Sequence, residues 1–347
     1  MMQISPEIQL FIREHSSDDV RVLALQAKKY PDIDMPTVIT QIAGRKVAAE
    51  KIPSWWEIEK IWYPKHLSLE QCSSEITARY KARLLQGDSL TDLTGGFGID
   101  CSFLATGFKS ATYVERQEEL CEIAAHNFPV LNLNHINIKN EDGVTYLQAM
   151  SPVDCLFLDP ARRNEHGGKT VAISDCEPNV AELEELLLQK ANRVMIKLSP
   201  MLDLSLALKE LKQTQEVHIL SVNNECKELL ILLGQTSPAE ISIHCVNLFT
   251  KGTQKEQHFV FTREQEQCSE CTYTDSLETY LYEPNASLLK AGAFRSIAAA
   301  YPVRKLHPNS HLYTSDTFIE NFPGRIFRIV NQCSFNKKEV KENLADL

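Results

Sequence analysis

The chain has 347 residues, of which 43% are hydrophobic and 24% charged, and its formal net charge is −10 at pH 7. This composition is typical of a globular protein of two or three domains, and the 13 glycines and 15 prolines exclude collagen-like and low-complexity chains. The apolar runs are shorter than a membrane span and the N-terminus lacks the pattern of a secretory signal. Ten cysteines in such a context fit reduced thiols, so we expect a cytoplasmic protein without membrane association.

Residues 1–67 are predicted to form an N-terminal helical region. Segments with helical character, such as Ser17–Lys29 and Thr37–Lys51, alternate with turns at prolines. A single helix is expected next over Ser68–Leu85, with Ser68 as its N-cap and Gly87 as its stop.

Short apolar runs alternate with helical segments from Ser89 onward, which favours a mostly parallel sheet covered by helices on both faces. The expected strands are Ser89–Leu93, Ser110–Glu115, Ile136–Asn140, Asp154–Asp159, Arg193–Leu198, Glu216–Val222 and Glu228–Leu233. The last two are separated only by Asn223–Lys227, too few residues for a helical crossover, so we expect an antiparallel hairpin at the edge of the sheet. Residues 68–235 are therefore predicted to form an α/β domain with a Rossmann-like, seven-stranded sheet whose last strand is antiparallel.

The remaining residues, 236–347, are predicted to form a small α+β domain. Strand-like runs at Glu240–Phe249 and Gln257–Thr262 precede a helix around Asn285–Ala300. Within residues 284–338 the basic residues outnumber the acidic ones by eight to two; the bases are Lys290, Arg295, Arg304, Lys305, Arg325, Arg328, Lys337 and Lys338. This stretch is a candidate contact for the phosphates of a nucleic acid, and a solvated surface remains the alternative.

A glycine-rich loop, Asp92-Leu93-Thr94-Gly95-Gly96-Phe97-Gly98, lies between an expected strand and an expected helix. Glycines allow a ligand to approach the backbone, and the start of the helix offers free N–H groups to an anion. Three further acids end the next expected strands: Glu115, Asp142 and Asp159. Glu115 is placed to bind ribose hydroxyls and Asp142 to accept a hydrogen bond from an adenine amino group. Taken singly, each acid could instead be an N-cap, a turn former or a solvated charge. A nicotinamide dehydrogenase is disfavoured because the G-x-G-x-x-G pattern is absent.

With these residues the chain resembles the class I S-adenosylmethionine-dependent methyltransferases, whose first motif is usually D-x-G-x-G-x-G. Thr94 stands here in place of the first glycine. The resemblance implies S-adenosylmethionine as the cofactor. The residues that it implies for cofactor binding are Asp92, Thr94, Gly95, Gly96, Phe97, Gly98, Glu115, Asp142 and Asp159.

The segment Asp159-Pro160-Ala161-Arg162 matches the position of the catalytic-loop motif of these enzymes. Asp159 and the carbonyl of Pro160 are expected to accept hydrogen bonds from an exocyclic amine, and Arg162 to stack on a base or pair with a phosphate. An Asp159 that only caps the loop or contacts the cofactor is the alternative. The segment Lys197-Leu198-Ser199-Pro200 lacks the cysteine that uracil-C5 methylation needs. Lys197 is expected to be a solvent charge at a strand end, and a place in the site is the alternative.

A narrower resemblance covers most of the chain. The segments Gln71–Ala82, Asp159–Arg163, Lys197–Pro200 and Tyr282–Ala286 are similar to a bacterial methyltransferase family with a THUMP-like (ferredoxin-like) C-terminal domain. This likeness implies methylation of an rRNA or tRNA base. A methyltransferase acting on a protein or a small metabolite, and a non-catalytic RNA-binding module with a vestigial cofactor pocket, are the alternatives.

Other features point to no additional chemistry. Cys268-Ser269-Glu270-Cys271 is a lone C-x-x-C, and His244 and His258 lie upstream without the usual paired spacing, so we expect no metal. Trp55, Trp56, Trp62 and Tyr63 are expected to pack the N-terminal helices rather than to stack on bases. The polar loop Arg163–Pro178 could close over a substrate or be a plain surface connection.

Overall fold

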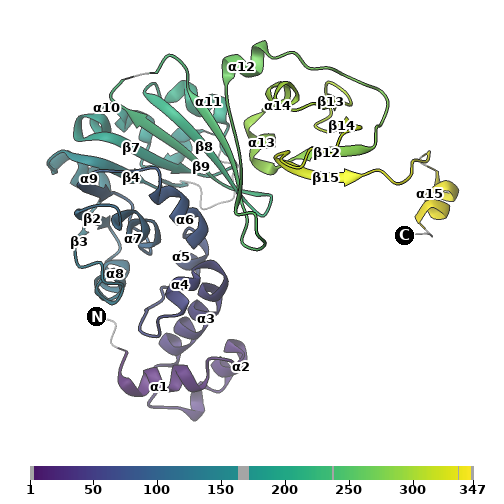
Figure 1. Cartoon of the computed structure of the whole chain (residues 1–347). Coiled ribbons are helices and arrows are strands. Elements are labelled where there is room, and N and C mark those ends of the chain that lie inside the picture. Colours follow the sequence, from purple (N-terminus) through teal and green to yellow (C-terminus); the bar gives the residue numbers. More distant parts are fainter. Residues whose placement is uncertain (1–3, 163–171, 237, 335, 345–347) are drawn as a thin grey trace. The chain divides into compact units, whose positions relative to one another are not determined.

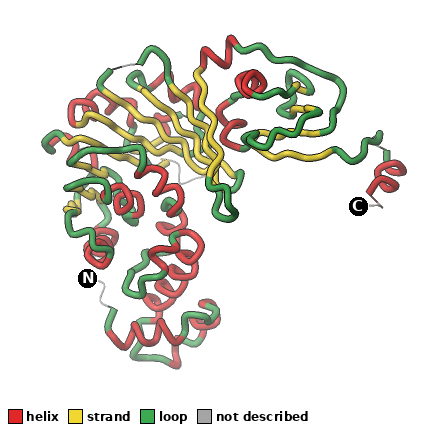
Figure 2. Tube along the Cα trace, in the orientation of Figure 1, coloured by secondary structure: helices red, strands yellow, loops and turns green. Residues whose placement is uncertain are grey.

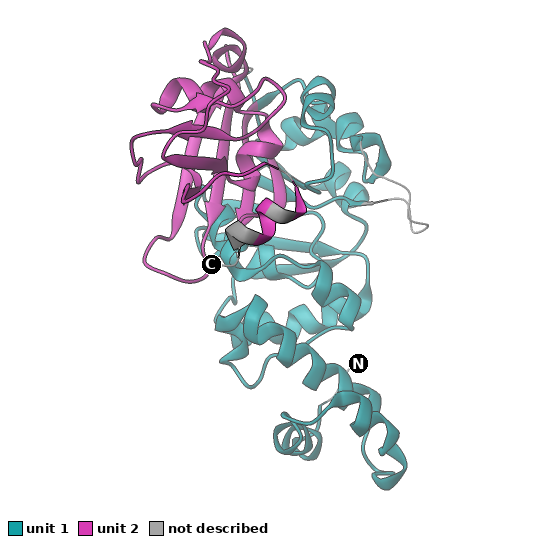
Figure 3. Ribbon diagram, turned by 90° about the vertical axis from the view of Figure 1, so that its right-hand side faces the viewer, with its two compact units in different colours: residues 1–214, 231–237 teal, residues 215–230, 238–347 magenta. Residues whose placement is uncertain are grey.

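The computed structural model describes residues 4–162, 172–236, 238–334 and 336–344. The chain divides into two compact units, Met1–Thr214 with Ile231–Ser237, and Gln215–Leu230 with Pro238–Leu347 (Figure 3). The border at Ser237–Pro238 lies near the expected boundary at residue 235, the N-terminal helical region is part of the first unit, and the other two borders fall inside strands. Most of the expected loop Arg163–Pro178 lies outside the described residues.

Short helices open the first unit (Figure 1). They are α1 (Pro6–Glu14), α2 (Val20–Leu25), the 3-10 turn η1 (Ala27–Lys29), α3 (Met35–Lys51), α4 (Pro53–Trp56), α5 (His66–Gln71) and α6 (Glu75–Ala82). Side-chain N-caps start several of them: Asp34 Oδ1 accepts from the Thr37 N–H at 3.4 Å at the start of α3. The expectation of a single helix over Ser68–Leu85 is wrong, because the helical conformation is interrupted between the end of α5 at Gln71 and the start of α6 at Glu75.

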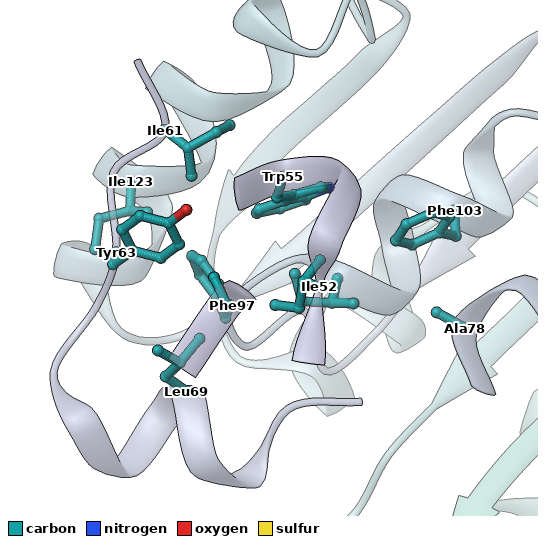
Figure 4. Packing of buried hydrophobic residues seen from close by; sticks show 11 residues of the cluster. Ile52, Trp55, Ile61, Tyr63, Leu69, Ala78, Phe97, Phe103 and Ile123 are labelled. Atoms are coloured by element: carbon teal, nitrogen blue, oxygen red, sulfur yellow. The ribbon is translucent and has the colours of Figure 1, made fainter. Parts of the chain in front are cut away.

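The N-terminal helices pack on the glycine-rich loop through a cluster of apolar side chains. Figure 4 shows Phe97 from the loop among Ile52, Trp55, Tyr63 and Leu69. The ring centroids of Trp55 and Phe97 lie 5.2 Å apart at 72°, an edge-to-face arrangement. The expectation that these aromatic residues pack rather than present a stacking surface is confirmed for Trp55 and Tyr63, which are buried.

The expected parallel sheet is confirmed. Its strands are β1 (Ser89–Asp92), β2 (Ser110–Glu115), β3 (Ile136–Asn140), β4 (Val153–Leu158), β7 (Ala191–Leu198), β8 (Thr214–Val222), β9 (Glu225–Gly234), β10 (Ser242–Leu248) and β11 (Glu256–Thr262). Among the described residues the hydrogen-bonded order is β11-β10-β8-β9-β7-β4-β1-β2-β3. The pairs β2–β3, β1–β2, β1–β4 and β4–β7 are all parallel.

Two features of the sheet differ from expectation. A two-residue turn joins β8 to β9, and both of its residues have positive φ, 49° at Asn223 and 67° at Asn224, as a type I′ hairpin turn requires. The hairpin is as expected, but β9 lies between β7 and β8 and not at an edge. The sheet then continues through β10, parallel to β8, and β11, antiparallel to β10, which were expected in a separate C-terminal domain.

Helices connect the parallel strands, as the alternating pattern predicts (Figure 2). They are α7 (Ile99–Ala105), α8 (Glu118–Val130), α9 (Gly143–Ala149), α10 (Val180–Lys190) and α11 (Leu204–Glu210). A small two-stranded sheet of β5 (Ala161–Arg162) and β6 (Cys176–Glu177) follows β4, and the 3-10 turn η2 (Ile173–Asp175) precedes β6.

The C-terminal part of the second unit holds a four-stranded antiparallel sheet of order β13-β14-β12-β15. In chain order, the elements of this part are α12 (Arg263–Cys268), β12 (Tyr280–Pro284), α13 (Ala286–Ala291), α14 (Phe294–Ala300), β13 (Arg304–Lys305), β14 (Tyr313–Ser315), β15 (Gly324–Arg328) and α15 (Lys337–Leu344). The expected α+β organisation of this region is confirmed. None of the helices in the described part of the chain has both the length and the apolar character needed to cross a membrane.

Candidate active site

Four acidic residues lie at the carboxyl ends of four neighbouring strands of the first unit. Asp159 follows β4, Asp92 ends β1, Glu115 ends β2 and Asp142 follows β3, and these strands are adjacent in the order β4-β1-β2-β3. The carboxyl ends of parallel strands meet at one edge, where open α/β sheets bind their ligands. The structure therefore brings together the four acids that the sequence pattern singled out.

The glycine-rich loop has the backbone that its glycines predict. Gly96 and Gly98 have positive φ values of 54° and 87°, which a side chain would disfavour. The Gly95 N–H donates to the Val114 carbonyl at 2.8 Å, and a Cβ at Gly95 would lie 2.2 Å from the Tyr113 ring. At Gly96, in contrast, a Cβ would meet only the Thr94 carbonyl oxygen, at 3.8 Å. The loop is thus packed against β2 at Gly95 and open at Gly96.

Asp92 is a fully buried carboxylic acid with one satisfied oxygen. Its Oδ1 accepts from the Thr94 N–H at 3.0 Å, whereas its Oδ2 is buried and has no hydrogen-bond partner among the described residues. Burial raises the pKa of Asp92 to about 8, with the negative charges of Asp100 and Asp159 acting in the same direction. A buried polar oxygen without a hydrogen-bond partner is costly, so this oxygen marks a place where a ligand group would stabilise the protein, and a cationic donor there would favour the ionised carboxylate.

Glu115 and Asp142 both hold the local backbone. Glu115 Oε2 accepts from the Gly96 N–H at 2.9 Å and its Oε1 from the Gln117 N–H at 2.8 Å, so Glu115 ties the loop to β2. Asp142 is the N-cap of α9, and its Oδ1 accepts from the N–H groups of Val144 and Thr145. A carboxylate has about four acceptor positions, so these bonds leave both acids able to accept from a ligand.

A second group of polar side chains is connected to Asp159 through Lys197. The Lys197 ammonium at the end of β7 forms an ion pair with Asp159 Oδ2 and lies 3.2 Å from Asp100 Oδ2. Lys81 Nζ lies 2.9 Å from Asp100 Oδ1. Ser73 Oγ donates to Asp100 Oδ2 at 2.7 Å and accepts from Lys81 at 2.7 Å and from Lys197 at 3.1 Å. We call these five residues the lysine–aspartate network.

The charges in this network determine how its carboxylates titrate. Burial by itself would raise the pKa of Asp100, but the adjacent ammonium groups of Lys81 and Lys197 outweigh it and hold this pKa well below its ordinary value. At Asp159, burial wins and raises the pKa, although Lys197 opposes it. Asp100 therefore stays ionised beside the two lysines, and Asp159 takes up a proton more readily than Asp100 does.

Several expectations about individual residues change. Lys197 is buried and in contact with Asp159, so the expectation of a solvent charge is wrong. The Phe97 side chain lies in the apolar cluster with Trp55, which leaves its backbone to face a ligand. Thr94 Oγ1 accepts from the Asp159 N–H at 2.6 Å. This hydrogen bond joins the glycine-rich loop to the Asp159–Arg162 segment, so the threonine that replaces the usual glycine has a structural role. The side chain of Arg162 lies outside what the structure describes.

The sequence pattern does not mark Ser73, Lys81 and Asp100 as site residues. Charged and hydroxyl residues are usually exposed. Ser73 and Lys81 come from the region of α6, whereas Asp100 lies on α7, and only the packing of these two helices brings the three together. One local signal was available. Asp100 follows the glycine-rich loop and is surrounded by Ile99, Cys101 and Phe103, which predicts a buried helix and therefore a buried charge that needs partners.

The basic stretch of the second unit is only partly available to a partner. Lys305 is buried and donates to the carbonyls of His307 and Pro308, and Arg304 forms an ion pair with Glu278. On β15, Arg325 is exposed beside the exposed ring of Phe327, with 5.6 Å between its guanidinium and the ring centre.

Comparison with known proteins gives two clear matches. A family model of a ferredoxin-like domain matches residues 280–323, the region of β12 to the start of β15. The crystal structure of a candidate methyltransferase from Porphyromonas gingivalis W83 is 34% identical, with a TM-score of 0.86; the alignment covers 98% of this chain and 85% of that chain. No curated protein matches the chain.

More distant structures share a smaller part. A modification subunit of a candidate type I restriction enzyme from Vibrio vulnificus YJ016 is 11% identical, with a TM-score of 0.39 over 58% of this chain and 56% of that chain. A candidate methyltransferase from Streptococcus mutans, solved with S-adenosylhomocysteine, is 13% identical, with a TM-score of 0.33 over 46% of this chain and 96% of that chain.

Proposed function

The chain belongs to the same family as the methyltransferase-like protein of Porphyromonas gingivalis, and on that premise we propose that it is an S-adenosylmethionine-dependent methyltransferase. The observation that carries the proposal is the ordered edge of the sheet, where Asp159, Asp92, Glu115 and Asp142 follow one another on adjacent strands. S-adenosylmethionine offers an ammonium group, a ribose diol and an adenine amino group, all of which are donors to carboxylates.

The residues present fit this cofactor. Asp92 Oδ2 is a buried acceptor that lacks a donor among the described residues, and the open side of Gly96 leaves room beside the loop. We assign Asp92 and the Thr94–Gly98 backbone to the amino-acid end, Glu115 to the ribose hydroxyls and Asp142 to the adenine side. When bound, the cofactor supplies a methyl group already activated on a sulfonium.

The protein has to hold the acceptor and take up its proton, because the methyl donor needs no further activation. Asp159 is the residue that we propose to accept a hydrogen bond from the substrate nucleophile and to receive its proton, since it is partly exposed. Lys197 orients the Asp159 carboxylate, and Asp100 with Ser73 holds Lys197 in place. Lys197 is thus a positioning residue, as is Lys81.

Calorimetry with S-adenosylhomocysteine tests the cofactor assignment. We expect Glu115→Gln to weaken binding by about 1–3 kcal/mol, the size of lost buried hydrogen bonds to ligand hydroxyls. Glu118→Gln, an exposed residue three positions further on, is the matched control and should bind as the unmodified chain does. Equal affinities for both variants, with unchanged melting temperatures, would remove Glu115 from the site.

For the substrate we propose RNA, bound in part by the ferredoxin-like domain that the sequence pattern describes as THUMP-like. The support is the pair Arg325 and Phe327, which lie two residues apart on β15 and therefore on the same side of the strand, and which are both exposed. Stacking on exposed aromatic rings combined with basic groups is how many proteins hold single-stranded bases. Lys305, which the charge pattern also indicated, is less suitable because it is buried. Arg304 and Arg325 are both ion-paired, with Glu278 and Glu283 respectively, and of these two only Arg325 lies beside an exposed aromatic ring.

Transfer of a labelled methyl group from S-adenosylmethionine to extracts of cells lacking the protein tests the substrate. We expect label in the RNA fraction, abolished by Asp159→Asn and reduced by Phe327→Ala, with Lys251→Glu as the surface control in the same unit. Label in the protein or small-molecule fraction would reject RNA but keep the enzyme class. Cofactor binding without any transfer would favour the non-catalytic alternative.

A further inference from the structure

Three histidines of the second unit form a row across neighbouring strands. His218 on β8 is in register with His244 on β10, and Val246 on β10 is in register with His258 on β11. Residues paired across strands, and residues two apart along a strand, point to the same face of a sheet. His218, His244 and His258 therefore share one face, together with Glu216, two residues before His218.

The side chains of this row are close enough to share an ion. His218 Nε2 lies 3.2 Å from Glu216 Oε2. The rings of His218 and His244 stack, with centroids 4.3 Å apart and an angle of 18° between their planes, so one ring has to rotate for both to direct a nitrogen lone pair at one ion. One ligand atom each from Glu216, His218 and His244 lies within 4.8 Å of the other two. Two ligands of a tetrahedral zinc at about 2.0–2.1 Å are about 3.3 Å from each other, so Glu216 and His218 already have a suitable spacing.

The fourth residue supplies the support that metal-bound imidazoles usually have. His244 Nδ1 and His258 Nε2 lie 3.1 Å apart, a hydrogen bond. If His244 donates through Nδ1–H, its Nε2 carries the lone pair and is the ligand atom. Metal-bound histidines commonly donate their other ring N–H to a neighbouring acceptor in this way.

We propose that Glu216, His218 and His244 form a binding site for one divalent transition-metal ion, with zinc as its natural occupant and His258 as the residue that orients His244. Imidazole and carboxylate donors together suit zinc, and this set is distinct from the Cys268–Cys271 pair that the sequence pattern drew attention to. The ion would link β8 to β10. It has no role in the proposed methyl transfer, whose residues all lie in the first unit.

The test is a titration of the full chain, freed of metal with a chelator, with Co²⁺ followed by absorption spectroscopy. Cobalt bound by nitrogen and oxygen shows ligand-field bands without the strong charge-transfer band of a cobalt–thiolate bond. We expect one ion per chain, Zn²⁺ that displaces it, and affinity that falls at least about tenfold in His244→Asn and in Glu216→Gln. His66→Asn on α5 and the double variant Cys268→Ser with Cys271→Ser should bind normally.

Melting curves keep the result interpretable, since Zn²⁺ should raise the melting temperature of the unmodified chain and of the two controls but not that of His244→Asn. Failure of the unmodified chain to bind Co²⁺ or Zn²⁺ would overturn the site. Binding that survives His244→Asn, or that carries a thiolate band and disappears with the two cysteines, would overturn it equally. None of these results bears on cofactor binding in the first unit.

Discussion

Lys81 Nζ lies 2.9 Å from Asp100 Oδ1, and Lys197 Nζ lies 3.2 Å from the other oxygen of the same carboxylate. One buried aspartate thus forms ion pairs with two buried ammonium groups, and Asp159 supplies the second negative charge of the network. Lys197 is in turn the ion-pair partner of Asp159, the carboxylate that we propose to act on the substrate. The stability of the fold and the position of the proposed catalytic group therefore depend on the same side chain, Asp100.

Asp100→Asn is expected to destabilise the protein by about 3–5 kcal/mol, because it leaves two buried lysines with one counter-ion fewer. Urea denaturation measures this change. Asp88→Asn removes an exposed ion pair with Lys109 and should cost at most about 1 kcal/mol. Adding Lys81→Met to Asp100→Asn should recover part of the loss. If Asp100→Asn were as stable as Asp88→Asn, the Asp100 carboxylate would not be stabilising the two buried lysines.

Asp92 predicts a dependence of stability on pH. Its pKa is about 8 in the folded protein, against about 3.9 in the unfolded chain. Between these values the folded protein holds a proton that the unfolded chain has lost, so this group makes the protein less stable as the pH rises from about 4 to 8. The free energy of unfolding of Asp92→Asn, relative to that of the unmodified chain, should therefore be higher at pH 8 than at pH 5. Urea denaturation at the two pH values measures this difference. A difference that is the same at the two pH values contradicts a raised pKa.

Gly95 and Gly107 form a matched pair for testing the loop. A Cβ at Gly95 would lie 2.2 Å from the buried ring of Tyr113, whereas at Gly107 it would lie 3.7 Å from the Leu104 carbonyl oxygen, an ordinary contact. We expect Gly95→Ala to cost about 1–3 kcal/mol through overpacking and to weaken binding of S-adenosylhomocysteine, because the loop is displaced. Gly107→Ala should change neither quantity. Equal thermal stability of the two variants is the outcome that this packing forbids.

Trp55 and Trp56 are neighbours in the sequence, but only Trp55 is buried, so they compare the loss of a buried ring with the loss of an exposed one. Trp55 is buried against Phe97, so Trp55→Ala should cost about 3–5 kcal/mol in urea denaturation and should also weaken cofactor binding through the loop. Trp56 is exposed, with the Arg45 guanidinium 5.7 Å from its ring centre, and Trp56→Ala should cost no more than about 1 kcal/mol. A similar loss in both variants would mean that the cluster does not support the loop.

The order of elements and the acids at their ends could be predicted from the sequence because both are local signals. Alternating apolar runs and helical segments define a parallel sheet, and in such a sheet an acid after each of four strands must come to the same edge. The strands expected at Ser110–Glu115 and Ile136–Asn140 are those observed, and the loop at Asp92–Gly98 has the positive φ values that its glycines allow. Asp159 was correctly placed at the end of its strand for the same reason.

The sequence by itself thus determined the class of the sheet and the acidic residues at its edge, since each depends on a short segment. Only the tertiary structure decided that β10 and β11 extend this sheet, that Lys197 points inward to Asp159, and that three histidines form a row. Strand pairing and burial of charge depend on partners far away in the chain, and a polar residue looks the same in the sequence whether water or a buried carboxylate will surround it.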